Sequence, residues 1–150
     1  MTLEALLAYA HILAIFTMIV FLTSEAALCR PEWLSPVIVE RLAKVDMIYG
    51  ISALAVLATG LARIFLGIKG AGWYGHNWLL WTKVGLFAVV GLMSIVPTIR
   101  FLRWRRALRA DGSMPAADEV RRVRKLVMAQ AHIIPIVPLA AVFLARGYGG

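Results

Sequence analysis

Three ionisable side chains, those of His11, Lys83 and His132, lie within stretches of sequence that are otherwise apolar enough to be buried in lipid. An ionisable group at membrane depth is costly, so such residues usually face the interior of a helix bundle or a binding site. A neutral imidazole is a ligand for haem iron, and an amine that has lost its proton in a buried site can donate a lone pair as well. The three residues are therefore candidate cofactor-binding residues, and His11 is the candidate metal ligand.

The first apolar stretch carries the most regular pattern, because Glu4, His11, Met18 and Glu25 recur at intervals of seven residues. Seven residues make nearly two helical turns, so the four side chains lie along one stripe that drifts by about 20° per heptad. We expect this stripe to face the interior of the bundle. A core histidine that hydrogen-bonds a neighbouring helix would fit the same pattern, so the sequence leaves both interpretations of His11 open.

If His11 binds haem iron, the second axial ligand would be Lys83 or His132. A rise of about 1.5 Å per residue puts His11 roughly 12 Å and Lys83 roughly 9 Å below one membrane surface, and His132 roughly 21 Å below it. The chain has no C-x-x-C-H sequence, so a haem b would be held without covalent attachment. Three scattered histidines and the single Cys29 give no recognisable zinc or copper spacing.

The elements that must position these residues are long apolar helices. The chain has 150 residues, of which 61% are hydrophobic, and its mean hydropathy is +0.81. A helix needs about 20 apolar residues to span a bilayer, and short connections make neighbouring helices antiparallel. The sequence therefore predicts an all-α polytopic membrane protein, a single-domain up-down bundle of four transmembrane helices over residues 3–28, 38–68, 77–106 and 115–146.

The net charge of +8 could indicate nucleic-acid binding, but the distribution of the charges argues against it. Of the 16 Lys and Arg residues, only Arg63, Lys69, Lys83 and Arg146 lie towards the side of the membrane that holds the termini. The other twelve flank the first and third connections, which is typical of cytoplasmic loops. We therefore expect both termini outside the cytoplasm, with lipid headgroups as the partner of the basic residues and no nucleic acid.

Counting along the helices divides the polar residues into two clusters. The outer cluster, near the termini, comprises His11, Lys83, Arg63, His76 and Glu4. The inner cluster, near the basic connections, comprises Glu25, Asp46, Tyr49, Arg41 and Arg100. For the inner cluster we expect ion pairs at helix ends that fix the packing of the bundle.

Several short segments spread over the chain form a recognisable set. They are Ala8-Tyr9-Ala10-His11, Arg41-Leu42-Ala43 with Asp46 and Tyr49-Gly50, Lys69-Gly70 before Tyr74 and His76-Asn77, Trp81-Thr82-Lys83, Pro97-Thr98-Ile99-Arg100-Phe101-Leu102-Arg103-Trp104, and Ala145-Arg146-Gly147-Tyr148-Gly149. This set resembles the bacterial family of predicted four-helix membrane proteins called domain of unknown function 2214. The resemblance implies a bacterial membrane protein of four helices, and it brings no established activity.

Two short segments are more distantly similar to membrane protein families associated with haem or copper. The segments His11-Ile12-Leu13-Ala14 and Trp81-Thr82-Lys83-Val84 are similar to segments of the haem-associated membrane protoporphyrinogen oxidase family, and loosely to the membrane domain of copper-resistance D proteins. In the oxidase family the histidine of the first helix and the lysine of the W-x-K motif are linked to haem binding. The similarity implies the same roles for His11 and Lys83.

These observations support one leading hypothesis and one alternative. The leading hypothesis is an integral protein of the bacterial cytoplasmic (inner) membrane that binds haem or a porphyrin between its helices for a redox role. The alternative is a non-catalytic membrane protein, or a small permease or ion-conducting bundle, whose intramembrane charges are structural. The residues identify no catalytic group, and small residues on the helix faces favour a homo-oligomer.

Overall fold

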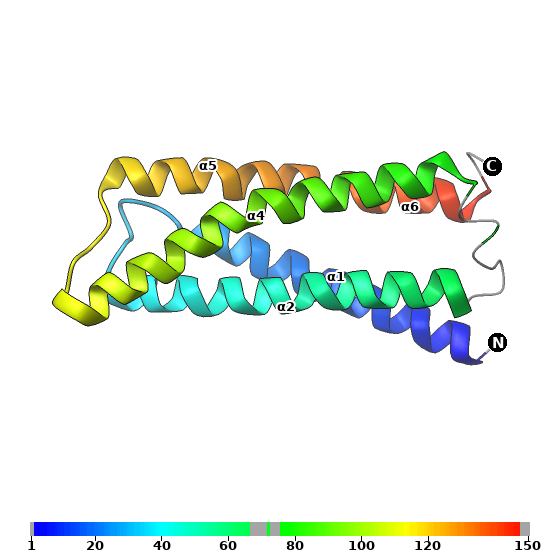
Figure 1. Ribbon diagram of the computed structural model, residues 1–150, viewed down its shortest axis with the longest axis horizontal. Coiled ribbons are helices and arrows are strands. Elements are labelled where there is room, and N and C mark those ends of the chain that lie inside the picture. Colours follow the sequence, from blue (N-terminus) through cyan, green and yellow to red (C-terminus); the bar gives the residue numbers. More distant parts are fainter. Residues whose placement is uncertain (1, 67–71, 73–75, 148–150) are drawn as a thin grey trace.

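A computed structural model of the chain describes residues 2–66, 72 and 76–147 and shows a bundle of long helices (Figure 1). The helices are α1 (Thr2–Leu28), α2 (Pro36–Leu66), α4 (Trp78–Asp111), α5 (Ala117–Ile133) and α6 (Ile136–Ala145). The predicted all-α fold is therefore confirmed. Five residues of the motifs quoted above lie outside the described part of the chain, namely Lys69, Gly70, Tyr74, Tyr148 and Gly149.

Four helical stretches are long and apolar enough to cross a membrane. They are α1, α2, α4 and the continuous stretch Ala117–Phe143, which contains α5 and most of α6. Both ends of the chain lie at one end of the bundle, and the α1–α2 and α4–α5 connections lie at the other (Figure 1). We call these the termini end and the basic end. The arrangement is the predicted up-down bundle of four membrane helices.

The boundaries of the third and fourth predicted helices differ from those observed. The third helix extends to Asp111, five residues beyond the predicted end, and stops where Gly112 adopts a left-handed conformation with φ 75°. The Gly112 N–H donates to the carbonyl of Leu108 at 3.0 Å, which closes the last turn. The fourth predicted helix is interrupted between Ile133 and Ile136, because Pro135 cannot donate a backbone hydrogen bond inside a helix.

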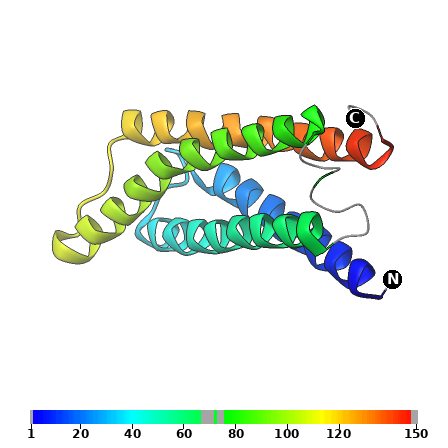
Figure 2. The same cartoon turned by 45° about the vertical axis from the view of Figure 1, so that its right-hand side comes forward.

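The packing of the helices differs between the two ends of the bundle. At the basic end a tight core joins α1, α2, α4 and α5, and its fully buried side chains include Leu22, Leu42, Phe101, Val120 and Val127. At the termini end the α1–α2 pair and the α4–α6 pair stand apart in both views (Figures 1 and 2). The core therefore holds the helices together at the basic end, while the two helix pairs diverge towards the termini end.

The outward faces of the helices carry large apolar side chains. Examples that are more than half exposed are Leu6, Phe16, Leu54, Phe65 and Leu92. A protein in water would not expose so many apolar side chains along α1, α2, α4 and α6, whereas lipid tails solvate them. The outward faces are those of a protein surrounded by a bilayer.

Candidate functional site

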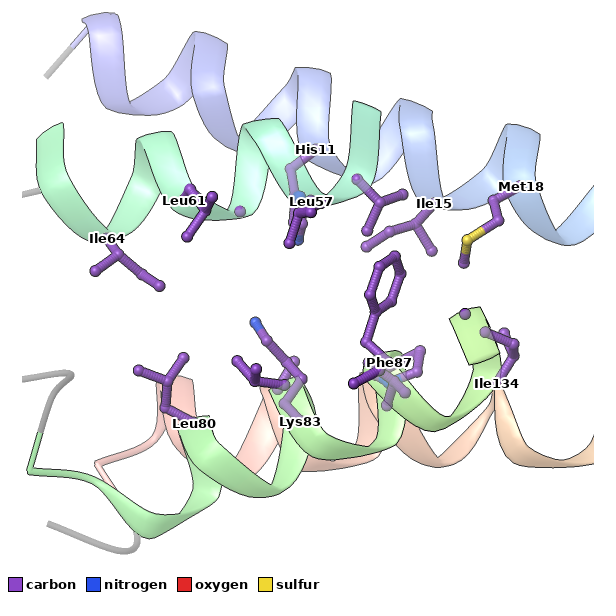
Figure 3. Close-up of a pocket in the computed structure, with 18 residues that line it drawn as sticks. His11, Ile15, Met18, Leu57, Leu61, Ile64, Leu80, Lys83, Phe87 and Ile134 are labelled. Carbon is purple, nitrogen blue, oxygen red and sulfur yellow. The ribbon is translucent and has the colours of Figure 1, made fainter. Parts of the chain in front are cut away.

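A cavity of about 340 Å³ lies between α1, α2, α4 and α6 at the termini end. Most of its walls are apolar (Figure 3). The lining includes Ile15, Leu57, Ile64, Phe87 and Ile134. Its volume falls within the range of about 300–1,000 Å³ that is usual for small-molecule and cofactor sites. The nitrogen-bearing side chains in this apolar lining are His11 and Lys83, so these two determine what chemistry the cavity offers.

His11 projects from the buried face of α1 and is fixed by a hydrogen bond to α2. Its Nδ1 lies 2.7 Å from the hydroxyl oxygen of Thr59. That hydroxyl lies 2.7 Å from the carbonyl of Ala55, to which it donates. A hydroxyl has one proton, so we assign the Thr59 oxygen as acceptor and His11 Nδ1–H as donor. Nε2 then carries the lone pair of the neutral imidazole.

The close approach of His11 to α2 depends on Gly60. A Cβ atom added at Gly60 would lie 3.3 Å from Cε1 of the imidazole, which is closer than ordinary van der Waals contact. The glycine therefore leaves space for the imidazole ring beside α2. Thr59 and Gly60, adjacent in sequence, together set the hydrogen bond and the position of the imidazole.

Lys83 lies on the opposite wall of the cavity, on α4. Its side-chain nitrogen and the His11 ring point towards each other across the gap (Figure 3). None of the ion pairs found among the described residues includes Lys83 or Glu4, so Glu4, the carboxylate of the outer cluster, does not neutralise the amine. Arg63, half-buried on α2, acts electrostatically on both His11 and Lys83. The outer cluster therefore presents basic groups to an apolar cavity without a paired carboxylate.

The two other histidines lie outside this cavity. His132 is exposed on α5, and its Nδ1–H donates to the carbonyl of Met128 at 2.6 Å. His76 is also exposed, and its Nδ1–H donates to the carbonyl of Gly72 at 2.8 Å. Of the three residues predicted to bind a cofactor, the structure brings His11 and Lys83 together and places His132 elsewhere.

A second cavity of about 200 Å³ lies next to the first and extends towards the basic end. The two cavities have four lining residues in common, which are Met18, Leu57, Phe87 and Gly91. Tyr49 lines the inner part of the second cavity, and its hydroxyl donates to Oε1 of Gln130 at 3.0 Å. The two cavities therefore share a wall, and the second one reaches a buried polar contact between α2 and α5.

The inner cluster differs from the one expected from the sequence. Glu25 and Asp46 are buried, and neither belongs to an ion pair within the described residues. Arg100 pairs with Glu119 at 2.9 Å, and Arg41 is exposed. The ion pairs expected within the inner cluster are therefore not formed at the two buried carboxyl groups among the described residues, because Arg100 binds Glu119 and Arg41 lies at the surface.

The heptad stripe of α1 is confirmed. The buried residues of this helix are His11, Met18, Leu22 and Glu25, which include three of the four stripe positions, while Glu4 at the frayed end is half-buried. The sequence reasoning did not single out Thr59 and Gln130, because it considered ionisable groups only. A search for any hydrogen-bonding side chain at membrane depth would have found both residues.

Comparison with known proteins gives a family for the chain. A family model described as "Predicted membrane protein (DUF2214)" matches residues 3–149. No curated protein and no solved structure matches the chain. Because the family model covers nearly the whole chain, and the structure has four helices that are long and apolar enough to cross a membrane, the chain belongs to this family of predicted membrane proteins.

Proposed function

We propose that the protein binds haem b without covalent attachment in the cavity between α1, α2, α4 and α6, with His11 as the iron ligand, and that it serves a redox role. One observation carries this proposal. The hydrogen bond from His11 Nδ1 to Thr59 leaves the Nε2 lone pair as the free donor atom of an imidazole that lines an apolar cavity. Metal-binding histidines are typically oriented in this way by a hydrogen bond from their other ring nitrogen.

The other properties of the cavity fit a haem. A porphyrin ring is large and apolar, and the cavity is lined mostly by aliphatic side chains together with Phe87. The adjoining second cavity adds about 200 Å³ of space. Haem also carries two propionate groups, and Arg63 supplies a cation without an ion-pair partner among the described residues. Apolar walls with a few basic groups therefore suit an apolar ring with acidic substituents.

Each residue of the site has a distinct role in this proposal. His11 would hold the iron, while Thr59 fixes the tautomer and orientation of His11 and Gly60 leaves space for its ring. Lys83 on the opposite wall would supply a second ligand, and Arg63 would bind a propionate. A bound haem supplies one-electron transfer at its iron, with a potential that depends on the axial ligands and the polarity of the site.

The membrane orientation belongs to the same proposal. We place the protein in the bacterial cytoplasmic membrane with both termini on the periplasmic side, because twelve of the 16 Lys and Arg residues flank the two connections of the basic end. In this orientation the haem cavity lies in the outer half of the membrane.

The visible spectrum of the detergent-purified protein tests the proposal. Protein from haem-replete cells should show a Soret band that shifts on reduction, and His11→Ala should remove the band while the helical content stays unchanged. His132→Ala and His76→Ala are matched controls, because both histidines lie outside the cavity, and they should keep the band. A colourless wild-type protein that also fails to bind added haem would refute the proposal, as would equal loss of the band in all three variants.

A further inference from the structure

Two buried carboxyl groups face each other at the basic end of the bundle. Glu25 of α1 is 1% exposed and Asp46 of α2 is 5% exposed, and their side chains lie within hydrogen-bonding reach of each other. Oε1 of Glu25 and Oδ1 of Asp46 are both buried without a hydrogen-bond donor. A carboxylate can only accept hydrogen bonds. If both groups are ionised, these two oxygen atoms therefore stay without a hydrogen-bond donor unless a ligand lies between the carboxylates.

The basic residues near this pair do not neutralise it. The Arg30 guanidinium lies over the Trp33 ring, 4.8 Å from its centroid, and Arg100 pairs with Glu119. Arg124 of α5 lies close enough to Cys29 to act on it electrostatically, but it forms no ion pair within the described part of the chain. The pair is therefore not the centre of a salt-bridge network.

The uncharged neighbours of the pair do not supply the missing donor either. The Tyr49 hydroxyl lies near both carboxyl groups, but it donates to Gln130. The Cys29 thiol lies near Glu25 and points to the carbonyl of Val120 at 3.9 Å. The titratable groups beside the pair are thus a phenol and a thiol whose hydrogen atoms are directed elsewhere.

A proton is the ligand that fits this arrangement. Two carboxylates in contact within an apolar core repel each other strongly, and one proton between them removes a charge and joins the two unsatisfied oxygens. A divalent cation fits poorly, because Ca²⁺ takes six to eight oxygen ligands. No group of three or more His, Cys, Asp or Glu side chains that could hold a metal occurs within the described residues.

Neither carboxyl group lines either cavity, but Tyr49 connects the pair to them electrostatically. Tyr49 lies within electrostatic range of both carboxyl groups and lines the second cavity, which shares Met18 and Phe87 with the outer cavity. We propose that Glu25 and Asp46 form a proton-binding site that holds one proton between two carboxyl groups and exchanges it with the cavities past Tyr49. In the exchange one carboxyl O–H bond breaks as an O–H bond of a neighbouring water forms, and no electron is transferred. Delivery of this proton to chemistry at a haem rests on the proposed function, whereas the proton site itself does not.

Infrared spectroscopy of the purified protein tests the site without any cofactor. The wild-type protein should show a C=O stretching band of a protonated carboxyl group at neutral pH, and the band should shift in D₂O. The double variant Glu25→Gln/Asp46→Asn should lack the band, since the amides can hydrogen-bond in place of the shared proton. Glu40→Gln is the matched control, because Glu40 is an exposed carboxylate bound by Arg109 at 2.8 Å, and it should leave the band unchanged.

Three results would overturn the proposal. These are the absence of the band at neutral pH, its persistence in the double variant, and its loss on addition of Na⁺, K⁺ or Ca²⁺ at constant pH, which would identify a cation site. The route past Tyr49 has its own test, because Tyr49→Phe should keep the band but slow its shift after mixing with D₂O. An unchanged rate would refute that route. Each result is independent of whether haem binds, so failure here is distinguishable from failure of the haem proposal.

Discussion

Replacing Thr59 by valine tests the orientation of the proposed iron ligand without touching the ligand itself. Valine keeps the branched shape of threonine but removes the oxygen that lies 2.7 Å from His11 Nδ1. A buried donor left without a partner costs about 1–3 kcal/mol. Loss of the hydrogen-bond partner of a metal-binding histidine typically weakens binding by about 10- to 100-fold. A tenfold change in Kd corresponds to about 1.4 kcal/mol, so the energetic cost of about 1–3 kcal/mol agrees with the weakening of about 10- to 100-fold. We therefore expect the haem Kd of Thr59→Val to rise by about 10- to 100-fold.

The assay is a titration of the haem-free protein in detergent with haem, followed at the Soret band, with circular dichroism to check that the helices are intact. Thr59→Ser is the control, because serine keeps the hydroxyl and should bind haem nearly as tightly as the wild-type protein. If Thr59→Val binds haem as tightly as the wild-type protein, the hydrogen bond does not orient the ligand. If serine is as poor as valine, the hydroxyl is not the cause of the loss.

Three further predictions concern the packing of the ligand, the opposite wall and the orientation in the membrane. Gly60→Ala places a methyl group 3.3 Å from Cε1 of the imidazole and should weaken haem binding by about 1–3 kcal/mol, the usual cost of overpacking. Gly85→Ala is the control, because its methyl group meets no atom within 4 Å. Equal losses of haem binding in the two variants would refute the steric argument. Lys83→Leu and Lys83→Arg should both change the haem spectrum if the amine binds iron, and a normal spectrum in the arginine variant would show that only the charge matters. Cysteines introduced at Ser113 and Thr2 should react with impermeant reagents from opposite sides of the membrane, with position 113 on the cytoplasmic side. The native Cys29 should not react, because its thiol is buried. Labelling of both positions from one side would refute the proposed orientation.

The sequence was sufficient to predict the number of membrane helices, their antiparallel order and the buried face of the first helix. All three depend on apolar length and on a repeat of seven residues, which are local properties of the chain. The pairing of His11 with Lys83 across one cavity could also be anticipated, because both were counted to a similar depth from the same surface. Depth along a helix follows from residue number alone.

Properties that depend on helix rotation could not be predicted in the same way. His132 was a candidate ligand because it lies within an apolar membrane stretch, but α5 turns this side chain to the outside. The Thr59 hydroxyl meets His11 only because of the rotation of α2 against α1, and Glu25 meets Asp46 for the same reason. Rotation is set by the packing of many side chains at once, so residue spacing within one helix cannot determine which polar groups meet between helices.

The interruption at Pro135 has a mechanical consequence for the cavity. Pro135 cannot donate to the carbonyl four residues earlier, so α5 and α6 are not joined by a continuous ladder of hydrogen bonds. Val120, Val123, Val127 and Gln130 anchor α5 in the core at the basic end, whereas α6 supplies wall residues such as Val137 and Pro138 to the outer cavity. We therefore expect α6 to move outwards about the break at Pro135 while α5 and the core at the basic end stay in place. This movement would open the outer cavity towards the lipid and let a rigid planar molecule enter.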